Sequence, residues 1–185
     1  MMIKNRDLKI FSGSTGIAFA NKVCTYLGVQ KGKSETIRFS DGNLFVRINE
    51  TVREKNIFFI QPIGLKPNDE FVEILFWIDA FKRASAHSVT VVIPYFGYAK
   101  GDKKDEPRVS IRARVCAEAI EMAGADRVVS MDLYSPQIQG FFKIPVDNLL
   151  AMPVFVEYIK RIELKNFVIV LPDAGYTKKA RKFAA

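Results

Sequence analysis

The chain has 185 residues, of which 49% are hydrophobic, and it carries a net charge of +8. This length fits one domain and part of another, and it is sufficient for a sizeable core. The longest apolar stretch, residues 71–81, contains Glu73 and Asp79 and is too short for a bilayer span, and the first residues lack a signal sequence, so we expect a cytoplasmic protein with no membrane partner.

The excess of positive charge favours ligands that carry phosphate. The basic residues form two groups, residues 100–108 and 177–183, and the first group also contains acidic residues. No zinc-finger, helix-turn-helix or aromatic-basic pattern is present, so we do not expect a nucleic-acid partner. We interpret Cys24 and Cys116 as core residues, and the single histidine, His87, as a surface residue.

The first part of the chain predicts a strand, a helix and a hairpin. Residues 8–13 are an apolar run typical of a strand. Residues 16–27 predict a helix that Gly28 ends in the left-handed conformation. Residues 35–40 and 44–48 predict the two strands of a hairpin, because an Asp-Gly pair lies between them.

Three buried strands and two helices are predicted next. The apolar runs that predict the strands are residues 56–62, 88–96 and 126–133, and the helices between them are residues 68–86 and 110–123. We expect Asn68 to cap the first of these helices and Asp69 and Glu70 to interact with its positive end. Gly124 is expected to end the second helix.

Continuous apolar strands separated by amphipathic helices predict an α/β fold with a mostly parallel sheet flanked by helices. Ligands of such proteins bind beyond the carboxyl ends of the strands. The strand ends in this sequence are rich in glycine, serine, proline and aspartate. We therefore expect the functional residues at that edge of the sheet.

The carboxyl-terminal part predicts an incomplete second domain. We expect residues 1–152 to form one α/β domain and residues 153–185 to form the start of another. The second part contains a predicted helix at 153–162, a predicted strand at 166–173 and a short basic segment. These elements are too few to bury their own apolar faces.

Residues 128–149 carry a candidate metal site. The strand in this stretch delivers Asp132 to its open end, and Asp147 follows after turn and aromatic residues. Two carboxylates near one strand end suit magnesium and phosphate. However, Tyr134 is neutral near pH 7 and Lys143 is a cation that opposes metal binding. The residues alone leave open whether this site is active.

Several stretches together resemble the ribose-phosphate pyrophosphokinase family, also called phosphoribosyl-diphosphate synthases. They are "LKIFSGS", "RFSDGNLFVRINETVR", "IDAFKRASA", "VIPYFGYAKGDKKDEPR", "AGADRVVSMDLYSPQIQGFFKIPVDNL" and "LPDAG", in the order found in that family. The resemblance implies a phosphoribosyltransferase-like fold of two similar domains. It also implies diphosphate transfer from ATP to ribose 5-phosphate with Mg²⁺, in a homo-oligomer or in a hetero-oligomer with an active pyrophosphokinase.

The resemblance implies an ATP site made of two loops. The residues concerned are Phe39, Asp41, Gly42 and Asn43 in the first loop, and Lys100, Gly101, Asp105 and Arg108 in the second. The family usually has glutamate at position 43 and an arginine–glutamine pair at positions 100 and 101. Lysine keeps the charge of arginine but lacks its planar fork. The residues alone also allow a hairpin turn with Phe39 in the core and a solvated charged loop.

The resemblance also implies that Asp132, Asp147 and Asp173 are the magnesium ligands. At position 134 the family has a histidine that contacts metal and phosphate, so Tyr134 is a candidate catalytic residue that we expect to be non-functional. The family usually has aspartate at position 143. The family's ribose 5-phosphate loop and its flexible lysine–arginine loop are not found in this sequence, so we expect no ribose 5-phosphate site in this chain.

Three hypotheses about function remain. The first is the family reaction, with this chain inactive alone as a fragment or a degenerate relative that binds magnesium weakly or not at all. The second is a catalytically silent relative that joins or regulates an active pyrophosphokinase. The third is a module that binds an anionic ligand, either a nucleotide or a nucleic acid. Five departures from the family around one substrate, at positions 43, 100, 101, 134 and 143, argue against turnover by this chain.

Overall fold

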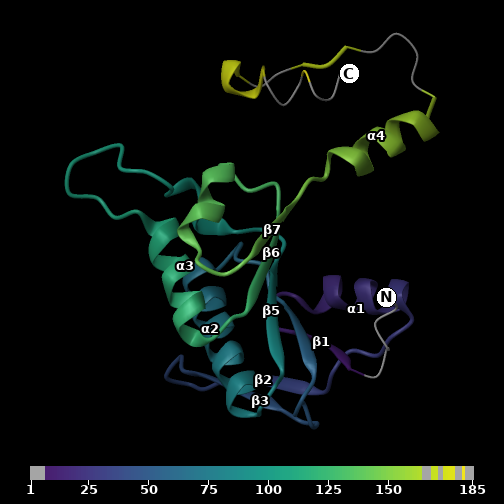
Figure 1. The fold of residues 1–185 in the computed structure, drawn as a ribbon, viewed down its shortest axis with the longest axis vertical. Helices are drawn as coiled ribbons and strands as arrows, with labels where there is room; N and C mark the ends of the chain where they lie inside the picture. The colour runs from purple at the N-terminus through teal and green to yellow at the C-terminus, as the bar shows by residue number, and fades with distance from the viewer. Residues whose placement is uncertain (1–6, 164–167, 171–172, 178–180, 182–185) are drawn as a thin grey trace. The chain divides into compact units, whose positions relative to one another are not determined.

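The computed structural model describes residues 7–163, 168–170, 173–177 and 181. The chain divides into two compact units, residues 1–149 and residues 150–185. The first unit is built on a five-stranded sheet whose strand order is β1-β4-β5-β6-β7 (Figure 1). Its strands are β1 (Leu8–Ser12), β4 (Asn56–Ile60), β5 (Ser88–Ile93), β6 (Arg127–Met131) and β7 (Val146–Leu149). Every pair of neighbouring strands is parallel, which confirms the predicted fold class.

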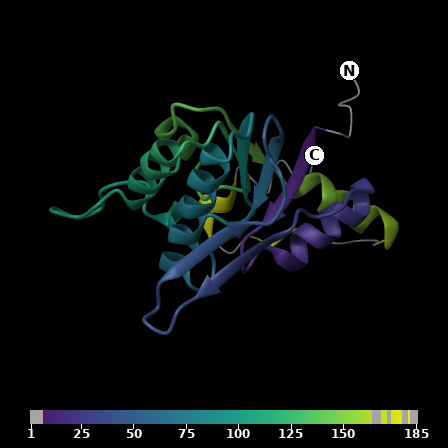
Figure 2. The same cartoon turned by 90° about the horizontal axis from the view of Figure 1, so that it is seen from below.

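Helices cover both faces of this sheet (Figures 1 and 2). One face carries α1 (Ile17–Leu27), and the other carries α2 (Pro67–Arg83) and α3 (Arg112–Ala123). Two short 3₁₀ helices, η1 (Gly97–Lys100) and η2 (Pro136–Phe141), lie in the segments that follow β5 and β6. The carboxyl ends of β5 and β6 therefore open into structured loops.

The hydrophobic core is divided by the sheet, because successive strand residues point to opposite faces. On the side of α2 and α3, Phe11, Phe59, Trp77 and Phe81 are fully buried, and the ring centroids of neighbouring pairs lie 5.0 to 5.9 Å apart. The smaller cluster under α1 consists of Ile10, Ala20, Cys24 and Ile60. Cys24 and Cys116 are both buried, as predicted, and burial raises the pKa of Cys116 to about 11.

The predicted hairpin forms a separate two-stranded antiparallel sheet of β2 (Ser34–Arg38) and β3 (Leu44–Ile48). Gly42 has a φ of 90° in the turn, a value that glycine adopts without strain. The hairpin is attached to α2 by polar contacts. Thr36 Oγ1 donates to Glu73 at 2.7 Å, and Arg38 forms an ion pair with Asp69 at 2.8 Å. These contacts fix the middle of β2 and its turn end to α2.

The structure confirms some helix ends and corrects others. Gly28 and Gly124 end α1 and α3 in the left-handed conformation, as predicted. The predicted cap at Asn68 is wrong: α2 begins at Pro67, its N-cap Lys66 makes no side-chain cap bond, and Asn68 Oδ1 instead accepts the hydroxyl hydrogen of Tyr98. Proline favours the first helical position because it has no N–H to leave unpaired.

The structure also contains a strand that the sequence did not predict. β7 is a short edge strand with Asp147 and Asn148 at its centre, so it lacks the apolar run that marked the other strands. Of the strand predicted at 166–173, residues 168–170 and Asp173 are described and are not in a strand. The remainder of that prediction lies outside the described residues.

The second unit contains α4 (Met152–Arg161) and η3 (Ala174–Tyr176). α4 is strongly amphipathic, yet none of its residues is buried. Its apolar side chains Val154, Phe155 and Tyr158 are each more than half exposed. Across the described parts of both units, every helix is too short or too polar to cross a membrane.

Candidate functional site

The candidate site lies at the carboxyl edge of the parallel sheet, where the loops after β1, β4, β5 and β6 emerge. In α/β sheets of this kind the carboxyl edge is the usual position of ligands. Lys100 and Gly101 follow β5, and Asp132 and Tyr134 follow β6, so this edge carries four of the predicted site residues.

The loop after β1, residues 12–16, is closed by side chains of the protein. The backbone N–H groups of Thr15 and Gly16 both donate to Gln61 Oε1, at 3.2 and 3.1 Å. Ser14 donates twice to Glu73, from its N–H at 2.9 Å and from its hydroxyl at 2.6 Å. A phosphate cradle needs open N–H groups at the start of the helix. Here those groups are already bound, so this loop is not a phosphate site.

Glu73 is the centre of a buried polar network that the sequence did not reveal. Its carboxylate is 2% exposed and accepts hydrogen bonds from five donors in all. Besides the two from Ser14, these come from Thr36, Gln61 and Trp77. The network joins the first loop, β4, α2 and the hairpin. The available signal was a glutamine at the end of an apolar strand and a glutamate in an apolar helix.

The hairpin tip presents the first set of predicted ATP-binding residues. Phe39 is 51% exposed, which rules out the alternative in which it lies in the core. Asp41 accepts two hydrogen bonds from Asn43, one from the backbone N–H and one from the side-chain amide, both at 2.9 Å. These bonds lower the pKa of Asp41. A glutamate at position 43 would keep the backbone bond but lose the bond from the side-chain amide, so Asn43 adds one contact that closes the turn.

The second predicted ATP loop follows β5. Lys100 is exposed at the end of η1, whereas Gly101 is buried. Asp105 and Arg108 lie in the exposed part of the loop, and Arg108 has a φ of 65°. The loop thus presents its charges to solvent at one end and is packed at the other.

Asp102, which the sequence did not suggest, anchors this loop. It is 6% exposed, and its Oδ2 accepts a hydrogen bond from Gln137 Nε2 at 3.1 Å. The loop after β5 is therefore fixed to η2 in the segment after β6. The second oxygen, Oδ1, is buried and finds no hydrogen-bond partner within the described part of the chain.

The structure separates the two carboxylates that were expected to share one strand end. Asp132 follows β6 with a φ of 45°, and its N–H donates to Leu149 O at 2.8 Å. Asp147 lies opposite Val129 of β6. Along β6, Val129 precedes Asp132 by about 10 Å. Its carboxylate contacts Arg127, at the amino end of β6, at 2.6 Å. The strand register thus places the two residues at different positions along the sheet, and their shared metal site stays a prediction.

Tyr134 and Lys143, which were expected to weaken metal binding, both lie at the surface. Tyr134 is 58% exposed, and Lys143 is exposed with its backbone N–H bound to Glu121. Asp173 belongs to the second unit. Within the described ranges, no three His, Cys, Asp or Glu side chains are close enough to hold a metal ion. The described residues of the first unit thus contain no cluster of magnesium ligands.

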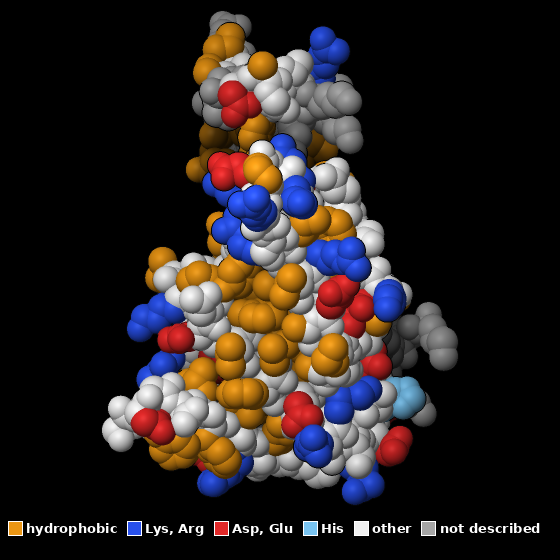
Figure 3. Space-filling view, turned by 90° about the vertical axis from the view of Figure 1, so that its left-hand side faces the viewer, with side chains coloured by type: hydrophobic (Ala, Val, Ile, Leu, Met, Phe, Trp, Pro, Cys, Tyr) orange, Lys and Arg blue, Asp and Glu red, His pale blue; other side chains and the backbone are white. Residues whose placement is uncertain are grey.

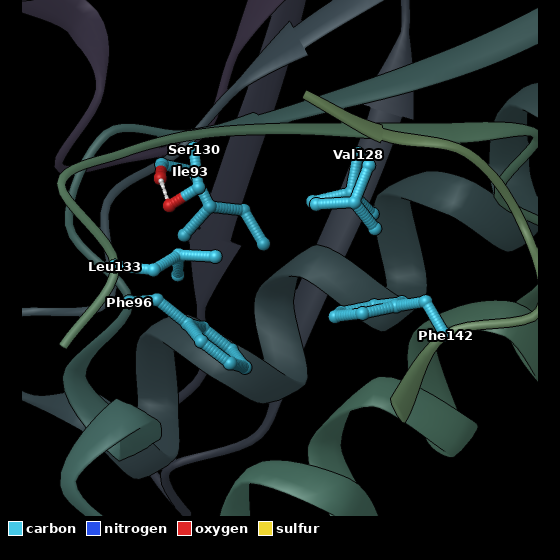
Figure 4. Close-up of a pocket in the computed structure, with 7 residues that line it drawn as sticks. Ile93, Phe96, Val128, Ser130, Leu133 and Phe142 are labelled. Carbon is cyan, nitrogen blue, oxygen red and sulfur yellow. Dashed lines mark hydrogen bonds between the residues drawn. The ribbon is translucent and has the colours of Figure 1, made fainter. Parts of the chain in front are cut away.

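A cavity lies close to this edge but is not a ligand site (Figure 4). It has a volume of about 10 Å³, roughly that of one water molecule. Its lining is apolar except for Ser130, and it includes Ile93, Phe96 and Phe142. The Ser130 hydroxyl donates to Ile93 O at 2.8 Å. Such a cavity is far too small for a nucleotide.

The fold and this edge define the class: an α/β protein of the phosphoribosyltransferase-like type, with candidate ligand residues on the loops after parallel strands. Residues 8–124 match the family described as the N-terminal domain of ribose phosphate pyrophosphokinase. That match covers more than half of the sequence. The chain belongs to the ribose-phosphate pyrophosphokinase family.

Individual relatives agree with this assignment. The chain is 48% identical over 181 residues to a ribose-phosphate pyrophosphokinase of Helicobacter pylori, covering 98% of this chain and 57% of the relative. It is 48% identical over 183 residues to the Thermotoga maritima protein of the same name, covering 97% of this chain and 58% of that protein. The chain thus spans a little more than half the length of these relatives.

A solved structure gives the same result for the fold. The phosphoribosylpyrophosphate synthetase from Mycobacterium smegmatis superimposes with a TM-score of 0.91 at 38% sequence identity. The superposition covers 96% of this chain and 60% of that chain. The chain therefore shares its fold with this relative over nearly its full length.

Proposed function

We propose that this chain binds ATP at the carboxyl edge of its sheet and does not by itself transfer diphosphate to ribose 5-phosphate. The observation that carries the proposal is the strand register, which places Asp147 opposite Val129 and beside Arg127, away from Asp132 at the end of β6. Phe39 and Lys100, which are candidate nucleotide contacts, are exposed, whereas Asp132 and Asp147 lie at different positions along their strands. Binding without turnover follows from that difference.

The residues of this chain support recognition of the base and of the phosphates. Phe39 presents a half-exposed ring at the hairpin tip, suited to stacking on a base. Lys100 places a cation at the end of η1, suited to phosphate oxygens. Tyr134 offers a neutral phenol where the family has an imidazole, so it donates a hydrogen bond but does not replace a metal ligand.

The proposal is tested by looking for the products of the family reaction. The chain is incubated with ATP, MgCl₂ and ribose 5-phosphate, and AMP is measured by liquid chromatography. We expect no AMP above the protein-free control, and the same for Tyr134→His combined with Lys143→Asp, because Asp147 stays paired with Arg127. AMP and 5-phosphoribosyl diphosphate formed in equal amounts by the unmodified chain would overturn the proposal.

A second function is favoured by the exposed apolar surface of α2 and α3. Figure 3 shows hydrophobic side chains gathered across the middle of that face. α2 exposes Val72 and Phe76, and α3 exposes Val115. Apolar patches of this kind mark interaction surfaces. We propose that this face binds another pyrophosphokinase-type chain, either a second copy or an active relative.

Sedimentation velocity tests the association. The unmodified chain is expected to sediment as an oligomer, and Phe76→Asp is expected to sediment as a monomer, since it places a charge in the proposed contact. Leu65→Asp is the control, because Leu65 is 98% exposed but lies in the loop before α2. A monomeric unmodified chain that also fails to associate with an active pyrophosphokinase would contradict the proposal.

A further inference from the structure

Arg112, the first residue of α3, lies directly against the second candidate ATP loop. A Cβ atom added to Gly101 would be 2.7 Å from Arg112 Nε, 3.0 Å from its Cβ and 3.4 Å from its Cζ. The side chain of Arg112 therefore occupies the space that a side chain at position 101 would need. Because Gly101 has none, the guanidinium group packs over the bare backbone next to Lys100.

The guanidinium of Arg112 is not neutralised by the protein. In the described part of the chain, every ion pair involves other residues. By contrast, Arg114 on the same helix forms an ion pair with Glu118 at 2.9 Å. Arg112 is exposed. It is thus a solvent-facing guanidinium that packs on a candidate ligand loop and has no acidic partner among the residues that the structure describes.

The surroundings hold Arg112 and Lys100 in place relative to each other. Ala113 N–H donates to Gly101 O at 3.1 Å, which joins the start of α3 to the loop. The next residue, Asp102, is buried and bound to Gln137. Burial is the main cause that raises the pKa of Tyr98, and the electrostatic interaction with Cys116 is a smaller one. The nearby positive charge of Arg112 lowers that pKa. Arg112 therefore belongs to the packed end of the loop, beside η1.

We propose that Arg112 binds the phosphate groups of the nucleotide together with Lys100. Arg112 contributes the planar fork that pairs with two phosphate oxygens, which Lys100 lacks. The two residues lie at the same junction, because Lys100 directly precedes Gly101 and Arg112 packs against Gly101. This inference rests on the proposed binding of ATP, and it adds a phosphate-binding residue that lies outside the predicted loop.

Calorimetric titration of the 185-residue chain tests the inference with three probes: ATP, inorganic tripolyphosphate and adenosine. Arg112→Ala is expected to weaken both ATP and tripolyphosphate binding about tenfold, the size of one charge-assisted contact. Adenosine affinity is expected to stay unchanged. The matched control is Arg114→Ala, which removes the same charge from the same helix and is expected to change each affinity less than twofold.

A second variant separates a lost contact from a lost fold. Adding Lys100→Arg to Arg112→Ala returns a guanidinium to the junction and is expected to recover most of the tripolyphosphate affinity. If Arg112→Ala and Arg114→Ala bind tripolyphosphate with equal affinity, this inference is overturned. The proposed binding of ATP would still stand. An unmodified chain that binds neither ATP nor tripolyphosphate would instead overturn the proposed function, and this inference with it.

Discussion

Replacing Glu73 with alanine is expected to lower the free energy of unfolding by about 4 kcal/mol. The carboxylate accepts five hydrogen bonds while buried. Removing it leaves several of those donors without a partner, and each orphaned buried group costs roughly 1–3 kcal/mol. Some of the donors regain water when the first loop opens, so the individual costs do not simply add. Urea denaturation followed by circular dichroism measures the change.

The matched control for this variant is Asp79→Ala on the same helix. Asp79 forms an exposed ion pair with Arg83 four residues later. Exposed pairs of this kind contribute little, so the free energy of unfolding is expected to change by about 0.5 kcal/mol or less. If Glu73→Ala costs no more than Asp79→Ala, the buried network does not hold the first loop, α2 and the hairpin together.

The second large effect is expected at Gly16, where alanine should lower the free energy of unfolding by about 3 kcal/mol. A Cβ atom there would lie 2.1 Å from the carbonyl oxygen of Ile60, a backbone atom of the sheet that cannot move aside. The loop would have to leave Gln61, which holds the N–H groups of Thr15 and Gly16.

Gly140→Ala serves as the comparison for this glycine. A Cβ atom at position 140 meets no other atom within 4 Å, so stability is expected to stay within about 0.5 kcal/mol. Thermal unfolding of the two variants gives the comparison directly. Equal midpoints would show that the loop after β1 adapts to a side chain and is not fixed by the sheet.

The sequence predicted most of the fold because apolar runs and glycines are local signals. Four parallel strands, the hairpin, the helices of the first unit and the glycine ends at Gly28 and Gly124 follow from periodicity and turn chemistry. β7 was missed because Asp147 and Asn148 at its centre interrupt the apolar run that usually indicates a strand. Its pairing with β6 stabilises it instead. The predicted cap at Asn68 was wrong because the helix begins one residue earlier, at Pro67, and because the Asn68 side chain accepts a hydrogen bond from Tyr98.

The candidate site was predicted less completely, because its contacts join residues far apart in the sequence. Loop positions such as Lys100 and Asp132 could be placed at the carboxyl edge from strand ends alone. The partners of the side chains could not: Glu73 binds Thr36, and Asp147 binds Arg127. Arg112 was missed for the same reason, since only the folded chain places it over Gly101.

The departures from the family pattern fall into two groups. Asn43 closes its turn through Asp41, and Gly101 makes room for Arg112, so the nucleotide side has formed new contacts. On the metal side, Tyr134 is exposed and Asp147 is tied to Arg127. The first group is compatible with the nucleotide binding that we propose, and the second is the basis for the proposed loss of the magnesium site.

The magnesium dependence of ATP affinity tests this account most directly. Calorimetric titration of the chain with ATP, once with excess MgCl₂ and once with a chelator, compares the two dissociation constants at constant ionic strength. We predict that magnesium does not strengthen ATP binding, because no carboxylate cluster receives the ion. Tenfold tighter binding with magnesium, abolished by Asp132→Ala, would show that the ion is held by the protein and would contradict the account.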